Sequence, residues 1–286
     1  MGTSITPNGP PGSNPLLPPG APPPPPPDGD PEGEPDDGPA DDAGDDSSPD
    51  GTPTPDVPPP DQTWRGARTV AGKFASSGGG GSGGGSPARV ARSLVRAQGG
   101  AGRATANARA GRATLSNLGG FLSTAAQEGV AAAVVRFGLQ FVGRTAAALL
   151  NDLARLLSSD GAIVDEAVAR AALLDTFQDL FQSSDADGLD ALNDLSAERV
   201  EAAMEGYVAN YINAQLLHYL ASRPIEDKAP DAATAFGLEC QLKDFVRGLV
   251  KLEFTGIDVL SVDWSGSQGQ AIVADLFERS FSLISG

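Results

Sequence analysis

The side chains in this sequence that could do chemistry are few and far apart. His218 is the only histidine and lies between Leu217 and Tyr219 in a helical pattern, which is more typical of a partly buried helix residue than of a general base. The sequence has no second histidine, no cysteine in a nucleophile context and no Gly-x-Ser-x-Gly elbow between a strand and a helix. The usual hydrolase constellations are therefore absent, and we expect a protein that is not an enzyme.

The candidate metal ligands also lack the required spacing. Asp185, Asp187 and Asp190 surround Gly188, but a calcium loop needs a third oxygen ligand before its glycine and a Glu six residues after it. A helix-capping turn is the better interpretation. Cys240 is the only cysteine, so a disulfide framework and a thiol-rich metal site are ruled out and a reducing compartment fits. We expect no metal and no cofactor.

Two adjacent carboxylates, Asp165 and Glu166, belong to the stretch 161–181 (GAIVDEAVARAALLDTFQDLF). Apolar residues recur there at helical spacing, and acids in the first turn of a helix are stabilised by its dipole. The pair therefore needs no acid-base role, although an unrecognised carboxylate site stays open as an alternative. We predict that this stretch is the central helix of an all-α body.

The N-terminus is the other candidate site. Residues 1–6 (MGTSIT) match the loose N-myristoylation pattern, with Thr6 at the hydroxyl position, but one lipid chain alone gives only marginal membrane binding. Removal of Met1 would leave the amine of Gly2 exposed at the tip of a long arm. An enzyme could reach it there.

Residues 1–86 are predicted to form that arm. Proline and glycine crowd this region, which therefore cannot bury enough apolar surface to offset the entropy of ordering its backbone. The proline run 22–27 favours a stiff polyproline II spacer, with an SH3-type ligand as the alternative. The glycine-rich run 78–85 reads as a tether and is no phosphate loop, because no Gly-Lys-Ser/Thr follows it.

A short island interrupts the arm at residues 63–74 (TWRGARTVAGKF). It gathers Trp64 and Phe74 with the cations Arg65 and Arg68. Such an island resembles a docking motif that orders on a partner or on its own domain. A chance cluster is the open alternative.

The formal net charge of -17 is the sum of acidic and basic blocks that lie in separate parts of the sequence. Residues 28–61 include many acids and no Lys or Arg, whereas residues 64–127 include Arg and Lys but no acid. The basic block could contact a polyanion, or the blocks could serve only solubility and self-association. No aromatic residues interleave the arginines as a nucleic-acid platform requires, so contact with nucleic acid is left open.

The remaining sequence predicts helices. Residues 87–118 form a basic segment whose weak helicity depends on packing or on a partner, and residues 119–286 form the helical domain. Ser196 is a candidate N-cap, and Pro224 is expected to end a helix over 197–222. The tyrosines Tyr207, Tyr211 and Tyr219 on that helix are interpreted as core residues with hydrogen-bonded hydroxyls. Residues 255–264 read as a short strand or an extended connector.

We identify no secretory signal and no membrane span in the sequence. Residues 1–12 lack the basic and apolar regions of a secretory signal. The most apolar run, 130–150, is broken by Arg136 and Arg144, so no membrane span is predicted. We expect a cytoplasmic protein.

Four short blocks carry a resemblance to a known family. They are residues 1–4 (MGTS) with Gly9 and Pro10, residues 65–68 (RGAR) with Phe74 and the glycine-rich tether, residues 164–170 (VDEAVAR), and residues 241–248 (QLKDFVRG). In these blocks, their order and its proline-rich spacer, the chain resembles the QatB proteins of the bacterial Qat anti-phage defence system. The segment after about Phe254 has no identified counterpart.

The resemblance implies a non-enzymatic member of a four-protein operon. Its partners would be a KAP-type P-loop ATPase, a QueC-like enzyme and a TatD-like nuclease. QueC-like enzymes make a nitrile-bearing deazaguanine, and related defence enzymes are similar in joining such a base to a protein N-terminus. The resemblance thus implies that Gly2 is the acceptor, that Thr3 and Ser4 help the QueC-like partner recognise it, and that the body binds the ATPase. A binding-only adaptor without modification is the alternative.

Overall fold

The computed structural model describes residues 60–79, 85–139, 146–158, 163–182, 192, 195–250 and 257–286. All regular elements in these ranges are helical, and none is a β-strand, which confirms the all-α prediction. Residues 1–59, with Gly2, Thr3, Ser4, the proline run and most of the acidic block, lie outside the described residues. No helix of the described ranges is long and apolar enough to cross a membrane.

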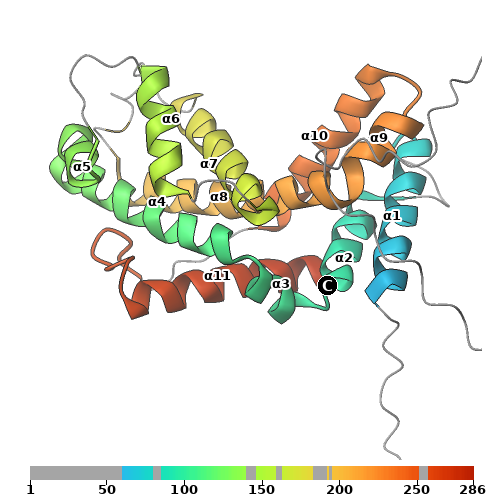
Figure 1. The fold of residues 1–286 in the computed structure, drawn as a ribbon, viewed down its shortest axis with the longest axis horizontal. Coiled ribbons are helices and arrows are strands. Elements are labelled where there is room, and N and C mark those ends of the chain that lie inside the picture. The colour runs from blue at the N-terminus through green and yellow to red at the C-terminus, as the bar shows by residue number, and fades with distance from the viewer. Residues whose placement is uncertain are drawn as a thin grey trace, which may run out of the picture. The chain divides into compact units, whose positions relative to one another are not determined.

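In chain order, the first helices of the described chain are α1 (Pro60–Ser76), α2 (Pro87–Ala97), α3 (Ala101–Asn107), α4 (Arg109–Glu128) and α5 (Val130–Arg136) (Figure 1). The remaining helices are α6 (Ala146–Leu157), α7 (Val164–Gln182), α8 (Ala197–Leu216), a π-helical turn (Leu217–Ala221), α9 (Ser222–Lys228), α10 (Ala232–Leu249) and α11 (Ser267–Ser285).

Helix α8, not α7, lies at the centre of the packing. It contacts α2, α4, α7 and α10, and it buries apolar and polar side chains around most of its circumference, including Tyr207, Asn210 and Gln215. Helix α7 contacts α4, α6 and α8 but leaves Val164 and Leu174 exposed. A helix buried on nearly all sides belongs to the core, whereas one with an exposed face lies at the surface.

Helices α4 and α11 run side by side below α8 (Figure 1). Two glycines of α4 permit its close packing on α8 and on the loop before α11. A Cβ atom at Gly111 would lie 2.5 Å from the ring of Tyr211, and one at Gly119 would lie 2.7 Å from the indole of Trp264. Any side chain at either position would displace a fully buried aromatic ring.

Local sequence signals set several helix starts. Ser86 caps α2 with Pro87 at the first helical position, and Ser196 caps α8 by accepting a hydrogen bond from the Arg199 N–H at 3.4 Å. The predicted cap at Ser196 is thus confirmed. Asp231 caps α10 through the Thr234 N–H at 2.7 Å. Each cap satisfies one of the free N–H groups at a helix start.

One local prediction was wrong. Pro224 does not end the helical path, which continues from α8 through the π-helical turn into α9. A helix tolerates a proline in its first turn, and Pro224 is the third residue of α9. Of the two alternatives for residues 255–264, the strand is not formed: the described part, 257–264, is a connector with turns, whose carbonyls accept hydrogen bonds from α4 side chains and not from another strand.

The predicted boundary at residue 119 falls inside α4. The basic segment 87–118 therefore continues into the helical body without a break. Its helices bury Val90, Leu94 and Leu115 in the common core. Packing thus supplies the stability that the short apolar stripes lack on their own.

Candidate functional site

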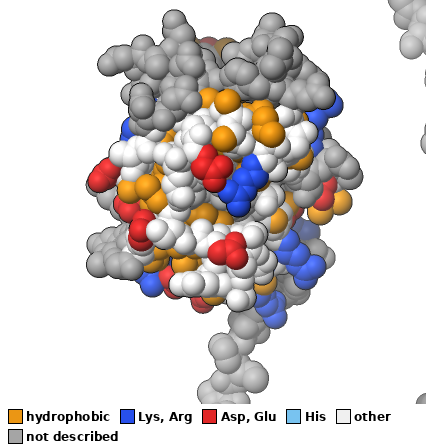
Figure 2. Space-filling view, turned by 90° about the vertical axis from the view of Figure 1, so that its left-hand side faces the viewer, with side chains coloured by type: hydrophobic (Ala, Val, Ile, Leu, Met, Phe, Trp, Pro, Cys, Tyr) orange, Lys and Arg blue, Asp and Glu red, His pale blue; other side chains and the backbone are white. Residues whose placement is uncertain are grey.

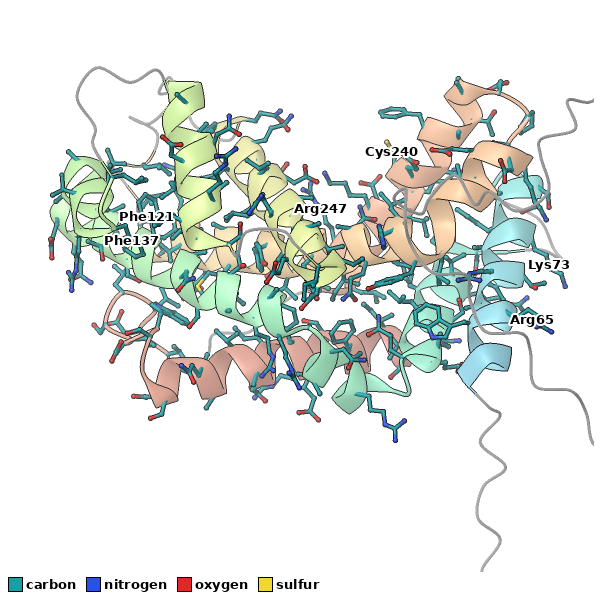
Figure 3. All side chains as sticks on the ribbon, in the orientation of Figure 1. Arg65, Lys73, Phe121, Phe137, Cys240 and Arg247 are labelled. Carbon is teal, nitrogen blue, oxygen red and sulfur yellow. The ribbon has the colours of Figure 1, made fainter. Side chains whose placement is uncertain are left out.

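The island at 63–74 is part of helix α1. Its aromatic residues point inward: Phe74 is fully buried, and the Trp64 ring lies against that of Tyr219 with centroids 5.5 Å apart. Its cations Arg65 and Arg68 are exposed, as is Lys73 (Figure 3). The aromatic half of the island therefore holds α1 on α2, α9 and the π-helical turn, while the cationic half faces outward.

The outward face of α1 is a candidate contact surface. Arg65, Arg68 and Lys73 form no ion pair with any residue that the structure describes. Cations without a local partner are free to meet an acidic surface on another molecule, and such contacts mainly raise the association rate and the specificity.

A chain of buried and partly buried hydrogen bonds starts at Asp165, in the 164–170 block. Its Oδ2 accepts from the Ala110 N–H at 2.8 Å, and its Oδ1 accepts from the hydroxyl of Tyr211. Gln215 Nε2 donates to the same hydroxyl at 2.8 Å, and Gln98 Nε2 donates to Gln215 Oε1 at 3.1 Å. Burial, with the charge of Asp165 beside it, raises the pKa of Tyr211 well above its usual value, so the phenol stays protonated and donates.

This network gives Asp165 a role that differs from the predicted one. Helix α4 has no side-chain cap of its own, because Ala108 occupies its N-cap position. Asp165 supplies the missing acceptor from α7 and bonds to α4 and α8 together. The carboxylate is therefore an interhelical cap, whereas the sequence suggested only a favourable position in its own helix.

A second polar cluster joins α7, α8 and α10 around Arg247, in the 241–248 block (Figure 3). Arg247 Nη2 donates to Asp179 Oδ2 and, at 3.1 Å, to Asn210 Oδ1. Asn210 Nδ2 donates to Asp179 and to Thr176 Oγ1 at 3.3 and 3.2 Å. Asp179 and Arg247 are each more than a third exposed, so solvent screens the pair and the contribution of the charges to stability is modest.

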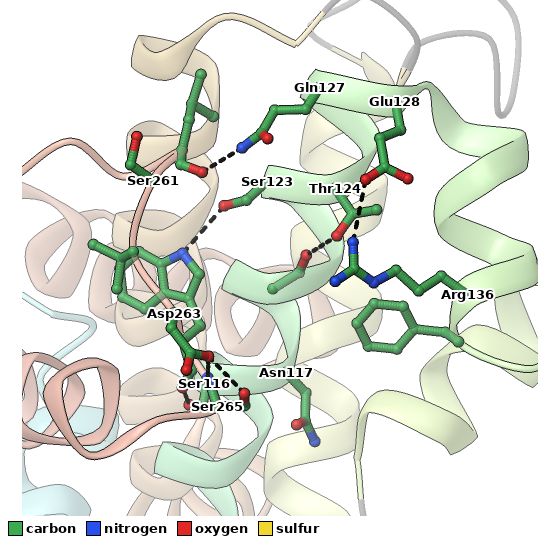
Figure 4. Close-up of a pocket in the computed structure, with 15 residues that line it drawn as sticks. Ser116, Asn117, Ser123, Thr124, Gln127, Glu128, Arg136, Ser261, Asp263 and Ser265 are labelled. Carbon is green, nitrogen blue, oxygen red and sulfur yellow. Dashed lines mark hydrogen bonds and ion pairs between the residues drawn. The ribbon is translucent and has the colours of Figure 1, made fainter.

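A polar cavity of about 410 Å³ lies between α4, α5 and the loop 257–266 (Figure 4). The loop is anchored by Trp264, whose indole N–H donates to Ser123 Oγ at 3.1 Å and to the Val259 carbonyl at 3.0 Å. At the rim Arg136 pairs with Glu128 at 3.2 Å. Among the described side chains on the face that carries α5, acidic, basic and apolar groups are interspersed (Figure 2).

The chemistry available in this cavity is hydrogen bonding. Its described lining includes hydroxyls, amides and the half-buried ring of Phe137 but no histidine or cysteine. Hydrogen bonds from Ser265 and Gly266 lower the pKa of Asp263, which keeps that carboxyl ionised and unsuited to general-acid work near neutral pH. Such a lining can hold a small polar molecule.

The remaining sequence candidates lie apart. His218 is exposed in the π-helical turn, with its ring edge-on to Tyr219 at a centroid distance of 4.9 Å. Cys240 is half-buried in α10 (Figure 3). The aspartates of the supposed calcium loop at 185–190 lie outside the described residues. In the described ranges, no three His, Cys, Asp or Glu side chains are grouped so that they could hold a metal ion.

A family model described as "Qat anti-phage system associated protein QatB" matches residues 99–284. The chain belongs to the QatB family. It is therefore a component of Qat anti-phage defence. No curated protein and no solved structure matches the chain.

The QatB match covers most of the described helices. It includes two of the four blocks, 164–170 and 241–248, and it extends through α11, for which sequence analysis identified no counterpart. The blocks at 1–4 and 65–68 lie outside the matched residues. The side chains Asp165 and Arg247, which the structure uses to join helices, both lie within the match.

Proposed function

We propose that this QatB family member is a non-enzymatic adaptor of the Qat defence complex whose N-terminus is modified at Gly2 by a QueC-like partner enzyme. Family membership carries this proposal. Thr3 and Ser4 form the rest of the sequence that the partner recognises, and the helical body binds a KAP-type P-loop ATPase. A TatD-like nuclease completes the set of partners.

The interhelical bonds of the family blocks support a scaffold. In each of the two blocks inside the family match, 164–170 and 241–248, a charged side chain is engaged between helices: Asp165 with Ala110 and Tyr211, and Arg247 with Asp179 and Asn210. Groups held in this way fix the relative positions of helices. A rigid body of this kind suits a protein that holds partners in place.

The arrangement of the chain supports a division of labour. Composition predicts that the residues before α1 form a long arm, and a long tether lets one end of a protein reach an active site while the other end stays bound. The exposed cations Arg65 and Arg68 lie on α1, next to the arm in sequence. They are the part of the docking island that remains available to a partner.

A binding-only adaptor is the second candidate. The exposed cations of α1 favour it, because they need no modification to act. In this alternative Gly2 has no role, and defence depends on the helical body and α1.

Phage-protection assays with paired variants separate the two. Gly2→Leu places a bulky residue at the proposed acceptor. Because Gly9 belongs to the first family block, Gly20→Leu, outside all four blocks, is the matched control in the same arm. The proposed function predicts that Gly2→Leu abolishes protection and Gly20→Leu retains it, with both proteins at wild-type abundance. Equal protection by both variants would refute modification at Gly2. The paired change Arg65→Glu and Arg68→Glu would then be expected to abolish protection through lost docking.

A further inference from the structure

A cavity of about 310 Å³ lies between α4 and α11. Its polar lining combines two arginines with hydroxyl and amide side chains and contains no acid among the described residues: Arg109, Arg112, Ser116, Asn117, Ser265 and Gln270. The cavity of Figure 4 differs in this respect, because Glu128 and Asp263 line it. The α4/α11 cavity is therefore distinguished by positive charge.

The two arginines are not neutralised by any residue in the described part of the chain. They lie three residues apart on α4 and so point to the same side of the helix. Neither forms an ion pair with a described residue. Two like charges that line one cavity without a described counter-charge attract an anion to it.

The neutral side chains that line this cavity can donate only a few further hydrogen bonds to a ligand. Asn117 Nδ2 donates to the Leu157 carbonyl at 2.9 Å, and Gln270 Nε2 donates to the Ser265 carbonyl at 3.2 Å. Each of these amide groups has a second N–H. Ser116 already donates to the Trp264 carbonyl, and Ser265 donates to Asp263 at 2.6 Å. The donors left for a ligand are thus the two guanidinium groups and one N–H from each amide.

We propose that this cavity binds the phosphate group of a nucleotide ester. Two guanidinium groups match the charge of a phosphate and can each donate a pair of parallel hydrogen bonds to its oxygens. The cavity is near the lower end of the range for small-molecule sites, and it is larger than a phosphate alone requires. Ala113 and Val273 give it an apolar wall against which a sugar or base packs.

The neighbouring cavity extends the site. Ser116, Asn117 and Ser265 line both cavities, so the two adjoin along α4. The hydroxyl- and amide-rich cavity of Figure 4 offers hydrogen bonds to the sugar and base of a ligand whose phosphate lies between α4 and α11. This inference is independent of any modification at Gly2.

The phosphate can come from a free nucleotide or from a nucleic-acid strand, and calorimetric titration distinguishes them. The full-length protein is titrated at low salt with inorganic phosphate, AMP, adenosine and a short single-stranded DNA. AMP binding that exceeds adenosine binding by about tenfold or more indicates a free nucleotide. Binding of the DNA without AMP, with strong salt dependence, indicates a strand. Either result supports the site.

Variants locate the binding. Arg112→Gln is expected to weaken binding of AMP or of the DNA by about tenfold or more. Arg103→Gln is the matched control, because Arg103 is exposed on α3 in the same basic segment but does not line the cavity. Its expected effect is less than about threefold, the effect of a distant charge. If Arg112→Gln lowers the melting temperature, the exposed Arg109 provides the test through Arg109→Gln.

Three results would overturn the inference. The first is the absence of binding by all the phosphate-bearing probes. The second is wild-type affinity in both Arg109→Gln and Arg112→Gln. The third is a loss of affinity in Arg103→Gln that equals the loss in the cavity variants, which would indicate a general attraction of the basic segment for anions.

Discussion

Replacing Asp165 with alanine should destabilise the protein far more than replacing its neighbour Glu166. Both acids lie in the first turn of α7, and a sequence pattern gives them the same role. In the structure Asp165 bonds to two other helices, through Ala110 and Tyr211, whereas Glu166 accepts a hydrogen bond from the Ile163 N–H at 3.4 Å, at the start of its own helix. The two substitutions therefore separate the helix-dipole interpretation from the interhelical one.

The expected magnitude follows from the two lost bonds. Loss of the carboxylate that caps α4 costs about 1 kcal/mol. The hydroxyl of Tyr211, a fully buried residue, also loses its acceptor, and an unsatisfied buried donor costs about 1 to 3 kcal/mol. Asp165→Ala should thus lower the free energy of unfolding by roughly 3 kcal/mol, equivalent to about 6 to 12 °C in melting temperature for a domain of this size. Glu166→Ala should cost about 0.5 kcal/mol.

Urea unfolding followed by circular dichroism, together with calorimetry, measures both variants. A double-mutant cycle with Tyr211→Phe isolates the bond to the hydroxyl, for which we expect a coupling free energy of about 1 to 2 kcal/mol. A loss below about 1 kcal/mol in Asp165→Ala, or equal losses in both single variants, would refute the reasoning, because the dipole alone accounts for effects of that size.

Two further predictions concern the buried aromatic residues. Gly119→Val should cost about 1 to 3 kcal/mol and change the near-ultraviolet circular dichroism of Trp264, because its side chain would meet the indole. Gly120→Ala is the control, since its Cβ would meet nothing closer than 3.8 Å, and unchanged Trp264 signals in Gly119→Val would contradict the packing. Burial also raises the pKa values of Tyr207 and Tyr211 above the unfolded value. Their stabilisation is complete below about pH 10 and is lost as the pH rises further. In an alkaline titration, most tyrosinate absorbance should therefore develop together with unfolding, and its appearance in the folded protein would show that these phenols are accessible.

The parts of the fold that sequence predicted are those with local signals. The helix predicted in the stretch 161–181 is observed as Val164–Gln182, and the helix predicted over 197–222 begins at Ala197, directly after its predicted cap Ser196. The tyrosines of α8 were assigned to the core, and Tyr207 and Tyr211 are fully buried with hydrogen-bonded hydroxyls. In these cases the apolar period and the capping residue lie within the element that they specify.

The contacts that build the candidate sites could not be predicted from the sequence, because they join residues that lie far apart in the chain. Asp165 and Ala110 are 55 positions apart, and Arg247 and Asp179 are 68 apart. No local pattern encodes such pairs, because tertiary packing decides which helices meet. The same holds for the cavity between α4 and α11, whose lining comes from segments at 109–117 and 265–273.

The docking island was only half predictable. Sequence grouped Trp64 and Phe74 with Arg65 and Arg68, but the structure divides them between an inner and an outer face of α1. Only the helical spacing of the residues indicates which of them face inward, since Ala67, Ala71 and Phe74 share one side of the helix. Treating the segment as part of a flexible arm hid that pattern.

The measurement that tests the central claim most directly is the intact mass of this protein, purified after co-expression with its operon neighbours and, separately, after expression alone. The account predicts a discrete added mass that maps to the N-terminal peptide at Gly2 and is lost when the QueC-like neighbour is omitted. An identical, unmodified mass in both preparations would contradict the claim and leave the binding-only adaptor.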